Sequence, residues 1–391
     1  MLNTPFSSWP CFTEQESEAV SRTLLSNKVN YWTGTECREF EKEFAAWTDC
    51  EYAVALSNGT LALDVALKAM NVGQGDDVIV TSRTFLASAS CIVTAGANPI
   101  FADVDLNSQN ITAATIKAVL TPKTKAIIVV HLAGMPAEMD DIMALAKVHD
   151  VYVIEDCAQA HGAKYKGRSV GSIGHVGAWS FCQDKIMTTG GEGGMVTTND
   201  KALWNAMWSY KDHGKSYDVI YHQQHAPGFR WLHDSFGTNW RMLEMQAVIG
   251  RIQLTRMADW MVKRQANSQM LDEAVADLAI VRCIEVPDYI EHAQYKHYLF
   301  IRPEFLKNGW TRDKIIEAIN EQGVPAYQGS CSEIYLEKAF DNTPWRPINR
   351  LPNARQLGEI SLMFLVHPTL TQDEIVKTSM VIRDVLQQAT K

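Results

Sequence analysis

Apolar and polar residues follow two different periods along the chain. Between residues 51 and 200, short continuous apolar runs alternate with segments whose apolar positions recur at helical spacing. The continuous runs predict strands buried on both faces, and the intervening segments predict helices. Strand–helix repetition of this kind indicates an α/β fold built on a mostly parallel sheet with helices on both sides. Strands are predicted at residues 52–56, 77–81, 100–104, 125–131, 151–155, 178–181 and 195–198, and helices at 36–47, 60–70, 86–95 and 137–149.

The chain on either side of this pattern is organised differently. Residues 1–35 are predicted as an N-terminal arm that ends in a turn. Residues 216–236 are polar and rich in His, Gln and aromatic residues, which predicts a long loop, and a helix is expected over 241–260. From about residue 266 a smaller α/β unit continues to the end of the chain. We therefore expect a large domain over 36–265 and a small C-terminal domain over 266–391, because 391 residues exceed the usual size of one core.

Composition narrows the class of protein. Hydrophobic residues make up 46% of the chain and charged residues 21%, which is ordinary for a soluble globular protein. The net charge of −9 argues against a general nucleic-acid binder. We find no signal peptide and no apolar run long enough to span a membrane, and the eight cysteines are scattered without a C-x-x-C pair. We therefore expect a cytoplasmic protein that binds neither nucleic acid nor membrane.

Lys185 carries the strongest chemical signal. It follows a short apolar segment and precedes a run rich in threonine and glycine at residues 188–194. Asp156 lies about thirty residues upstream, at the end of an apolar strand. A lysine amine can hold the aldehyde of pyridoxal phosphate as a Schiff base, and a carboxylate can keep the pyridine nitrogen protonated so that the ring accepts electrons. Lys185 and Asp156 are therefore our candidate catalytic residues.

Other residues supply candidate parts of the same site. Ser57-Asn58-Gly59-Thr60 lies between a strand and a helix, where free N–H groups and a hydroxyl would meet an anion. Alone, this segment would be explained as a plain N-cap. Ser180, five residues before Lys185, could supply another part of the same site and therefore supports the phosphate interpretation. Phe85 is a candidate for stacking on a planar ring, although most phenylalanines are simply core. Gln159 and His161 follow Asp156, and His161 is equally well explained as a buried core histidine.

Metal binding is not expected. His222, His225 and His233 lie in the polar loop without an acidic partner at fixed spacing. The missing G-x-G-x-x-G fingerprint also disfavours a nicotinamide-dependent oxidoreductase.

Several motifs together resemble the DegT/DnrJ/EryC1/StrS sugar aminotransferases, which are fold-type I pyridoxal phosphate enzymes. The resemblance covers nearly the whole chain, and the order and spacing of the motifs make it specific. The motifs are Glu39-Phe40-Glu41, Ser57-Asn58-Gly59-Thr60, Glu155-Asp156-Cys157-Ala158-Gln159, Ser180-Phe181-x-x-x-Lys185, Glu192-Gly193-Gly194, His213-Gly214-Lys215 and Gly237-x-Asn239-x-Arg241.

The resemblance implies a role for each matching residue. Lys185 would carry the cofactor, Asp156 would pair with its ring nitrogen, and Gln159 would bond its ring hydroxyl. Phe85 would stack on the ring. The phosphate would be held by Gly59, Thr60 and Ser180, within the segment that begins at Ser57 and Asn58. Asn239 would reach the site of a neighbouring subunit, which implies a homodimer with shared sites; the substrate candidates are His213, Arg230 and Arg241.

The resemblance implies amino transfer from L-glutamate to a keto or aldehydo sugar. Relatives that dehydrate carry His in place of the lysine, so Lys185 favours transamination. The substrate stays open between a free sugar, such as the 8-aldehyde that gives 8-amino-Kdo for lipopolysaccharide, and a nucleotide-linked 3- or 4-keto-6-deoxy sugar. The candidate cations for an acidic or nucleotide-linked sugar are Lys215, His225, Arg230 and Arg241.

One departure from the family pattern affects the substrate assignment, and one alternative concerns the class of function. Gly190 and Gly191 stand where the family usually has one small residue, and they would reshape the loop over the sugar. A pyridoxal-phosphate-binding regulator without turnover is the alternative of another class.

Overall fold

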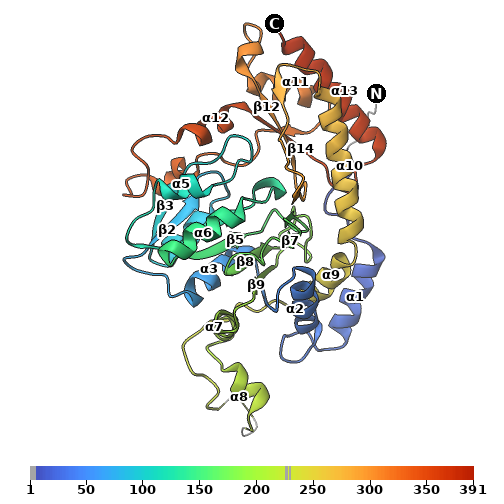
Figure 1. Cartoon of the computed structure of the whole chain (residues 1–391). Helices are drawn as coiled ribbons and strands as arrows, with labels where there is room; N and C mark the ends of the chain where they lie inside the picture. Colours follow the sequence, from blue (N-terminus) through green and yellow to red (C-terminus); the bar gives the residue numbers. More distant parts are fainter. Residues whose placement is uncertain (1–5, 225–227, 229) are drawn as a thin grey trace.

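A seven-stranded sheet forms the centre of the larger part of the molecule (Figure 1). The computed structural model describes residues 6–224, 228 and 230–391. The strand order is β1-β9-β8-β5-β4-β2-β3, and β9 runs antiparallel to both its neighbours while the pairs from β8 to β3 are parallel. The predicted mostly parallel sheet is therefore confirmed. Its strands are β1 (Tyr52–Leu56), β2 (Asp77–Thr81), β3 (Asn98–Ala102), β4 (Thr124–Val130), β5 (Tyr152–Asp156), β8 (Val176–Ser180) and β9 (Gly194–Thr198).

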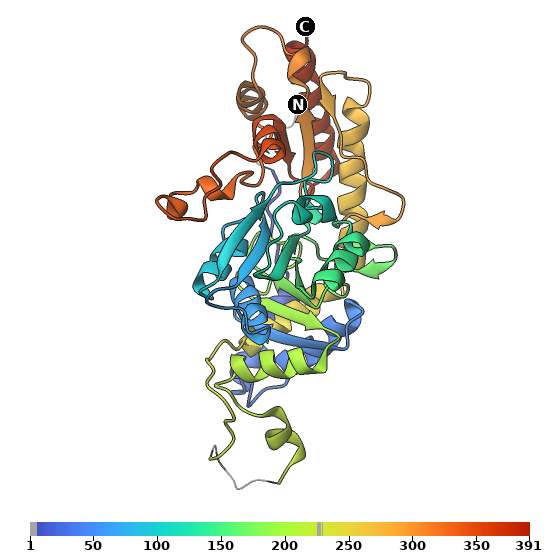
Figure 2. The ribbon, with the colours of Figure 1, turned by 60° about the vertical axis from the view of Figure 1, so that its left-hand side comes forward.

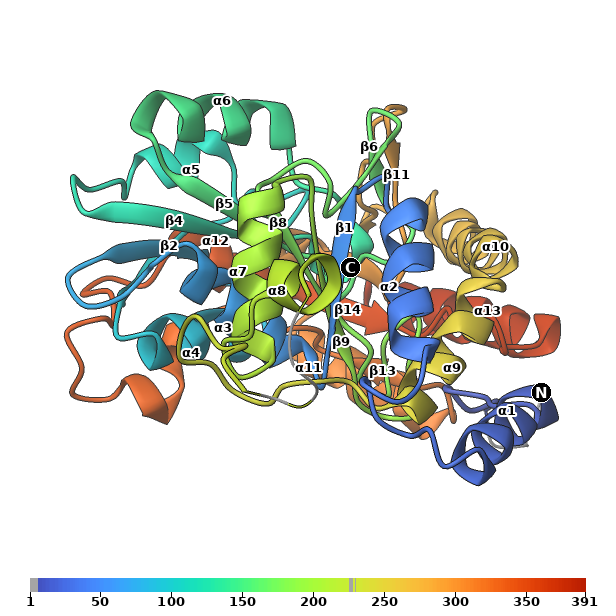
Figure 3. The same cartoon turned by 90° about the horizontal axis from the view of Figure 1, so that it is seen from below.

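Helices cover both faces of this sheet, as continuous apolar strands require. Ile79 and Ile127 belong to one hydrophobic cluster, whereas the adjacent residues Val78 and Ile128 belong to another. Figure 3 shows α5 and α6 on one side of the strands and α3 and α4 on the other. The helices of this part are α2 (Glu36–Trp47), α3 (Gly59–Ala69), α4 (Ala87–Thr94), α5 (Ala113–Lys117), α6 (Met139–His149) and α7 (Lys201–Lys211).

A second sheet of four antiparallel strands, in the order β10-β12-β14-β13, lies with its helices at the end of the molecule that carries both termini (Figure 1). A third, small sheet has the order β11-β6-β7. The strands of these two sheets are β10 (Val281–Arg282), β12 (His297–Ile301), β13 (Ala326–Tyr327), β14 (Ser361–Phe364), β6 (Lys164–Tyr165), β7 (Arg168–Ser169) and β11 (Ile290–Glu291). The helices beside the four-stranded sheet are α11 (Arg312–Glu321), α12 (Pro352–Ile360) and α13 (Gln372–Ala389).

Helices depart from the predicted pattern in three places. The N-terminal arm contains α1 (Glu14–Leu25), which Thr13 and Glu16 begin with a capping box. The expected loop at 216–236 contains the short helix α8 (Tyr217–His222), whose N-cap Ser216 accepts a hydrogen bond from Val219 N at 3.4 Å. The single helix expected over 241–260 is wrong, because α9 (Glu244–Leu254) ends before α10 (Met257–Val275) begins.

The expected domain boundary at residue 266 lies inside α10. This long helix runs from the large sheet to the four-stranded sheet and packs beside α13 (Figure 1). The division into 1–35, 36–265 and 266–391 therefore stays a prediction. The segment around α8 projects from the end of the molecule opposite the termini (Figure 2).

Among the helices of the described residues, none combines the length and apolar character that crossing a membrane requires.

Candidate active site

A cavity of about 590 Å³ lies between the carboxyl ends of the large sheet's strands and the four-stranded sheet. Phe85, Gln159 and Lys185 reach it from the segments that follow β2, β5 and β8. In an open parallel sheet this edge is where ligands bind. Lining residues from the rest of the chain are Tyr295, Lys296, Tyr298, Tyr327, Gly329, Ser330, Cys331, Ile334, Glu337, Met363 and Leu365.

Lys185 presents its amine to this cavity. Its side chain is 17% exposed, and Nζ lies 3.8 Å from Asp184 Oδ1 and 5.3 Å from the centre of the Tyr295 ring. The Tyr295 hydroxyl donates a hydrogen bond to the other oxygen of Asp184. The backbone of the loop is held by Trp9, whose indole Nε1 donates to the Lys185 carbonyl at 2.7 Å. The predicted nucleophile is therefore accessible to a ligand and fixed at its backbone.

Asp156 is buried at the end of β5, behind the cavity. Ser88 Oγ donates to its Oδ2 at 2.8 Å, and Ala158 N donates to its Oδ1 at 3.2 Å. Burial raises the pKa of this carboxyl, and the two hydrogen bonds and the positive charge of Lys185 oppose that rise. A buried carboxylate of this kind is stabilised by a cationic partner, which a protonated pyridine nitrogen would supply.

The start of α3 packs directly on Ser180. A Cβ added at Gly59 would lie 2.5 Å from the Cβ of Ser180, so only glycine permits this approach. Asn58 caps the helix by accepting a hydrogen bond from Leu61 N at 3.0 Å, and Thr60 is exposed beside it. The helix N-terminus and the Ser180 hydroxyl therefore face one place, as an anion site requires. Ser57 instead donates its hydroxyl to the Arg241 carbonyl at 3.0 Å.

Phe85 and Gln159 both line the cavity. Phe85 is 71% exposed, which is unusual for a core phenylalanine and suits a residue that a planar ligand covers. Gln159 Oε1 accepts a hydrogen bond from Ala133 N at 2.7 Å, which fixes the side chain at the cavity wall.

His161 takes no part in the cavity. It is buried between Trp179 and Phe181, with ring centres 5.3 and 5.6 Å away. Burial lowers its pKa to about 3, so the ring is neutral. The core-histidine interpretation is the one that the structure supports.

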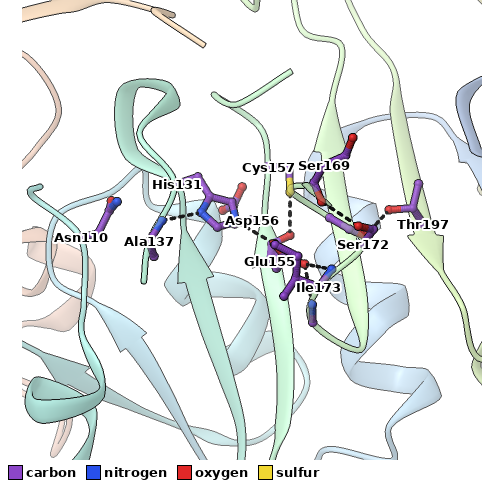
Figure 4. A network of polar contacts seen from close by, with 12 residues as sticks. Asn110, His131, Ala137, Glu155, Asp156, Cys157, Ser169, Ser172, Ile173 and Thr197 are labelled. Carbon is purple, nitrogen blue, oxygen red and sulfur yellow. Dashed lines mark hydrogen bonds and ion pairs between the residues drawn. The ribbon is translucent and has the colours of Figure 1, made fainter. Parts of the chain in front are cut away.

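A polar network fixes the strand that carries Asp156 (Figure 4). His131 Nε2 lies 2.9 Å from Glu155 Oε2, and the N–H groups of Ile173 and Gly174 donate to Glu155 Oε1 at 2.9 and 2.6 Å. Burial alone would raise the pKa of Glu155, but His131 and the backbone donors lower it. Glu155 therefore ties β5 to its neighbours, a role that sequence reasoning missed.

The side-chain atoms of His131, Glu155 and Cys157 that could ligate a metal ion lie within 4.8 Å of one another. Each already has a hydrogen bond: His131 Nδ1 accepts from Ala137 N at 3.1 Å, and Cys157 Sγ donates to the Glu155 carbonyl at 3.6 Å. We therefore interpret this cluster as a hydrogen-bond network.

Asn239, His213, Arg230 and Arg241 do not line this chain's own cavity, and neither do Asp156, Ser180 and residues 57–60 described above. Asn239, His213 and Arg230 are exposed, and Arg241 Nη1 forms an ion pair with Asp212 Oδ1 at 2.8 Å. His225 lies outside the described residues. Gly190 and Gly191 also do not line the cavity.

The sequence profile of the DegT/DnrJ/EryC1/StrS aminotransferase family matches residues 10–383. The chain belongs to this family. It is a pyridoxal-phosphate-dependent sugar aminotransferase with the aminotransferase fold predicted from its motifs.

Three similar proteins illustrate the match. The X-ray structure of the aminotransferase from Psychrobacter cryohalolentis is 63% identical, covers 98% of this chain and 100% of its own, and superposes with a TM-score of 0.97. A UDP-N-acetyl-3-dehydro-alpha-D-glucosamine 3-aminotransferase from Acidithiobacillus ferrooxidans is 35% identical over 93% of this chain and 92% of its own. A GDP-perosamine synthase from Escherichia coli O157:H7 is 39% identical over 70% and 71%.

The geometry of this aminotransferase fits its cofactor. Four features meet at one edge of the large sheet. They are the N-terminus of α3, which packs on Ser180 through a glycine, a buried carboxylate, an exposed aromatic ring and an accessible lysine amine. Sequence reasoning missed the lining residues in the four-stranded sheet and in the segment before β12, because no local motif marks them. Examples are Tyr295, Lys296 and Tyr327.

Proposed function

We propose that this enzyme transfers the amino group of L-glutamate to a keto or aldehydo sugar, giving an amino sugar for lipopolysaccharide or another surface polysaccharide in the cytoplasm. The observation that carries the proposal is the Lys185 amine facing a 590 Å³ cavity beside the buried Asp156. The sugar substrates named in the descriptions of two relatives support it.

Each part of the site has a proposed task in holding the cofactor. Gly59, Thr60 and Ser180 would bind the phosphate at the start of α3, and Asn58 would keep that helix start in place. Phe85 and Gln159 would contact the ring, and Asp156 would hold a proton on the ring nitrogen. When bound, pyridoxal phosphate supplies the carbonyl that exchanges amino groups and the ring that delocalises negative charge.

Lys185 would act twice. Its amine would hold the cofactor between turnovers, and after release it would move a proton at the reacting substrate carbon. Asp184 and Tyr295 lie beside the amine and keep it over the cavity.

The acceptor has two candidates. One is a free aldehydo sugar, including the 8-aldehyde that gives 8-amino-Kdo. The other is a nucleotide-linked 3- or 4-keto-6-deoxy sugar, favoured by the relatives described as a GDP-perosamine synthase and a UDP-sugar 3-aminotransferase.

We further propose a homodimer with shared sites. Asn239, His213 and Arg230 are exposed and lie outside the lining of their own cavity, and Arg241 forms an ion pair with Asp212, which is next to His213 and bridges to Asn239. Such residues are available to a partner subunit's site, where they would contact cofactor phosphate or sugar.

Lys185→Ala tests the central claim. We expect loss of the visible absorbance of the bound cofactor. Turnover should fall roughly a thousandfold or more. Lys338→Ala, which removes an exposed lysine outside the cavity lining, should change neither. Amino transfer from labelled glutamate to a panel of aldehydo sugars and nucleotide keto-sugars would identify the acceptor. Normal turnover in Lys185→Ala would refute the proposal.

A further inference from the structure

Lys296 is a second lysine in the cavity, and it comes from the opposite wall to Lys185. It directly precedes β12, and its amine lies 4.9 Å from the centre of the Tyr295 ring. Neither the sequence motifs nor the family resemblance assigns it a task.

The acids of the cavity are not paired with Lys296. Asp184 is engaged by the Tyr295 hydroxyl and lies 3.8 Å from Lys185 Nζ, and Glu337 is the other acidic lining residue. Among the described residues, no carboxylate lies within 4.0 Å of Lys296 Nζ. The cavity therefore presents an ammonium group without a local ion pair.

A buried cation, Arg264, lies close to Lys296. Arg264 of α10 is buried and donates to the carbonyls of Gln294 and Tyr295, both at 3.3 Å, so it fixes the backbone that carries Lys296. Burial lowers the pKa of Lys296 to about 8, Asp184 opposes this, and Arg264 and Lys185 add to it. An anion placed next to this amine would offset its repulsion from Arg264, which remains when the Lys185 amine holds the cofactor.

We propose that Lys296 binds an oxyanion of the substrate, a carboxylate or a phosphate, and so selects which molecules the Lys185 amine meets. The inference rests on the proposed function, because it assumes that substrates enter this cavity. The shared ligand chemistry has three sources: the carboxylate of the amino donor, the carboxylate of an acidic sugar, or the diphosphate of a nucleotide-linked sugar.

Binding measurements on the cofactor-loaded enzyme separate these sources without turnover. The probes are glutarate, galacturonate and UDP, each titrated by calorimetry into the unaltered enzyme and into Lys296→Met, Lys296→Arg and Lys338→Met. At least one probe should bind Lys296→Met about tenfold more weakly, as expected for a lost charged contact. Lys296→Arg should stay within about threefold of the unaltered enzyme, because the charge remains. Lys338→Met should bind as the unaltered enzyme does.

The dependence on pH gives a second signature. The groups that face Lys296 are Asp184, Lys185, Tyr295, Arg264 and His367, and burial holds the pKa of His367 at about 3, so it is neutral. Affinity for the responsive probe should fall about tenfold between pH 7 and pH 9 in the unaltered enzyme, as the ammonium of Lys296 deprotonates. In Lys296→Arg it should fall less, because arginine stays charged.

Two results would overturn the inference: equal affinity of all three probes for the unaltered enzyme and Lys296→Met, or no binding of any probe to the unaltered enzyme. Neither result bears on whether Lys185 catalyses amino transfer, which the turnover of Lys185→Ala decides separately. If glutarate alone responds, Lys296 binds the donor; if galacturonate or UDP responds, it selects the acceptor.

Discussion

The two walls of the cavity are built by different means. The first wall, formed by Phe85, Gln159 and Lys185, follows three strands of the large sheet, with Asp156 and Ser180 at the strand ends behind it. The second wall, formed by Tyr295, Lys296 and Tyr327, comes from the four-stranded sheet and the segment leading into it. The first wall follows the ends of buried parallel strands, whereas the second is formed by side chains of the antiparallel four-stranded sheet and the segment before β12. We infer that the first wall carries the reaction and the second chooses the substrate.

Asp156→Asn should have the largest effect on turnover. Loss of the carboxylate behind the first wall should lower kcat on the order of a hundredfold for every accepted sugar, because the charge that supports the electron-accepting ring is lost. Steady-state kinetics with two different acceptors would measure this. A loss confined to one acceptor would contradict the division between the walls.

The same variant should behave in the opposite way without cofactor. Burial raises the pKa of Asp156, so its charged form destabilises the fold increasingly as pH rises through that raised pKa. Asp156→Asn removes this cost and keeps an oxygen that can accept from Ser88 or Ala158. The cofactor-free variant should therefore melt at the same temperature as the unaltered protein or slightly higher at pH 7, and a lower melting temperature would count against this account.

Gly59→Ala should weaken cofactor binding by roughly tenfold or more, since the new Cβ would meet Ser180 Cβ at 2.5 Å and displace the helix start. The check is the dissociation constant of pyridoxal phosphate. Adding Ser180→Gly removes the two nearest atoms, Cβ and Oγ, so the double variant should bind the cofactor more tightly than two independent losses predict. Strict additivity would show that the clash is not the cause.

Tyr295→Phe on the second wall should have the smallest effect. It removes the hydrogen bond to Asp184 and keeps the ring beside Lys185. We expect kcat/KM for the sugar to fall about three- to tenfold, the scale of one hydrogen bond, with cofactor affinity unchanged. A parallel loss of cofactor affinity would show that the second wall also holds the cofactor.

The first wall could be predicted from sequence because local patterns fix it. The strands predicted at 52–56 and 77–81 are β1 and β2, since residues buried on both faces leave continuous apolar runs. Lys185 and Phe85 follow such strands at short distances, so their side of the cavity follows from the sheet topology.

The second wall could not be predicted in the same way. Tyr295 and Lys296 become cavity residues only when the four-stranded sheet packs against strand ends more than a hundred residues earlier in the chain. The same limit explains α8, whose six residues are too few for a clear helical period. The proposed role of Asn239 and Arg230 in a neighbouring subunit's site follows from the family resemblance, because no local pattern in the sequence marks a contact between chains.

The first described residues of the chain have a practical consequence. Ser7 donates its hydroxyl to Glu374 of α13 at 2.9 Å, and two residues later Trp9 bonds to the Lys185 carbonyl. This N-terminal segment therefore contacts both the loop of Lys185 and α13. Removing residues 7–9 would therefore release both contacts at once.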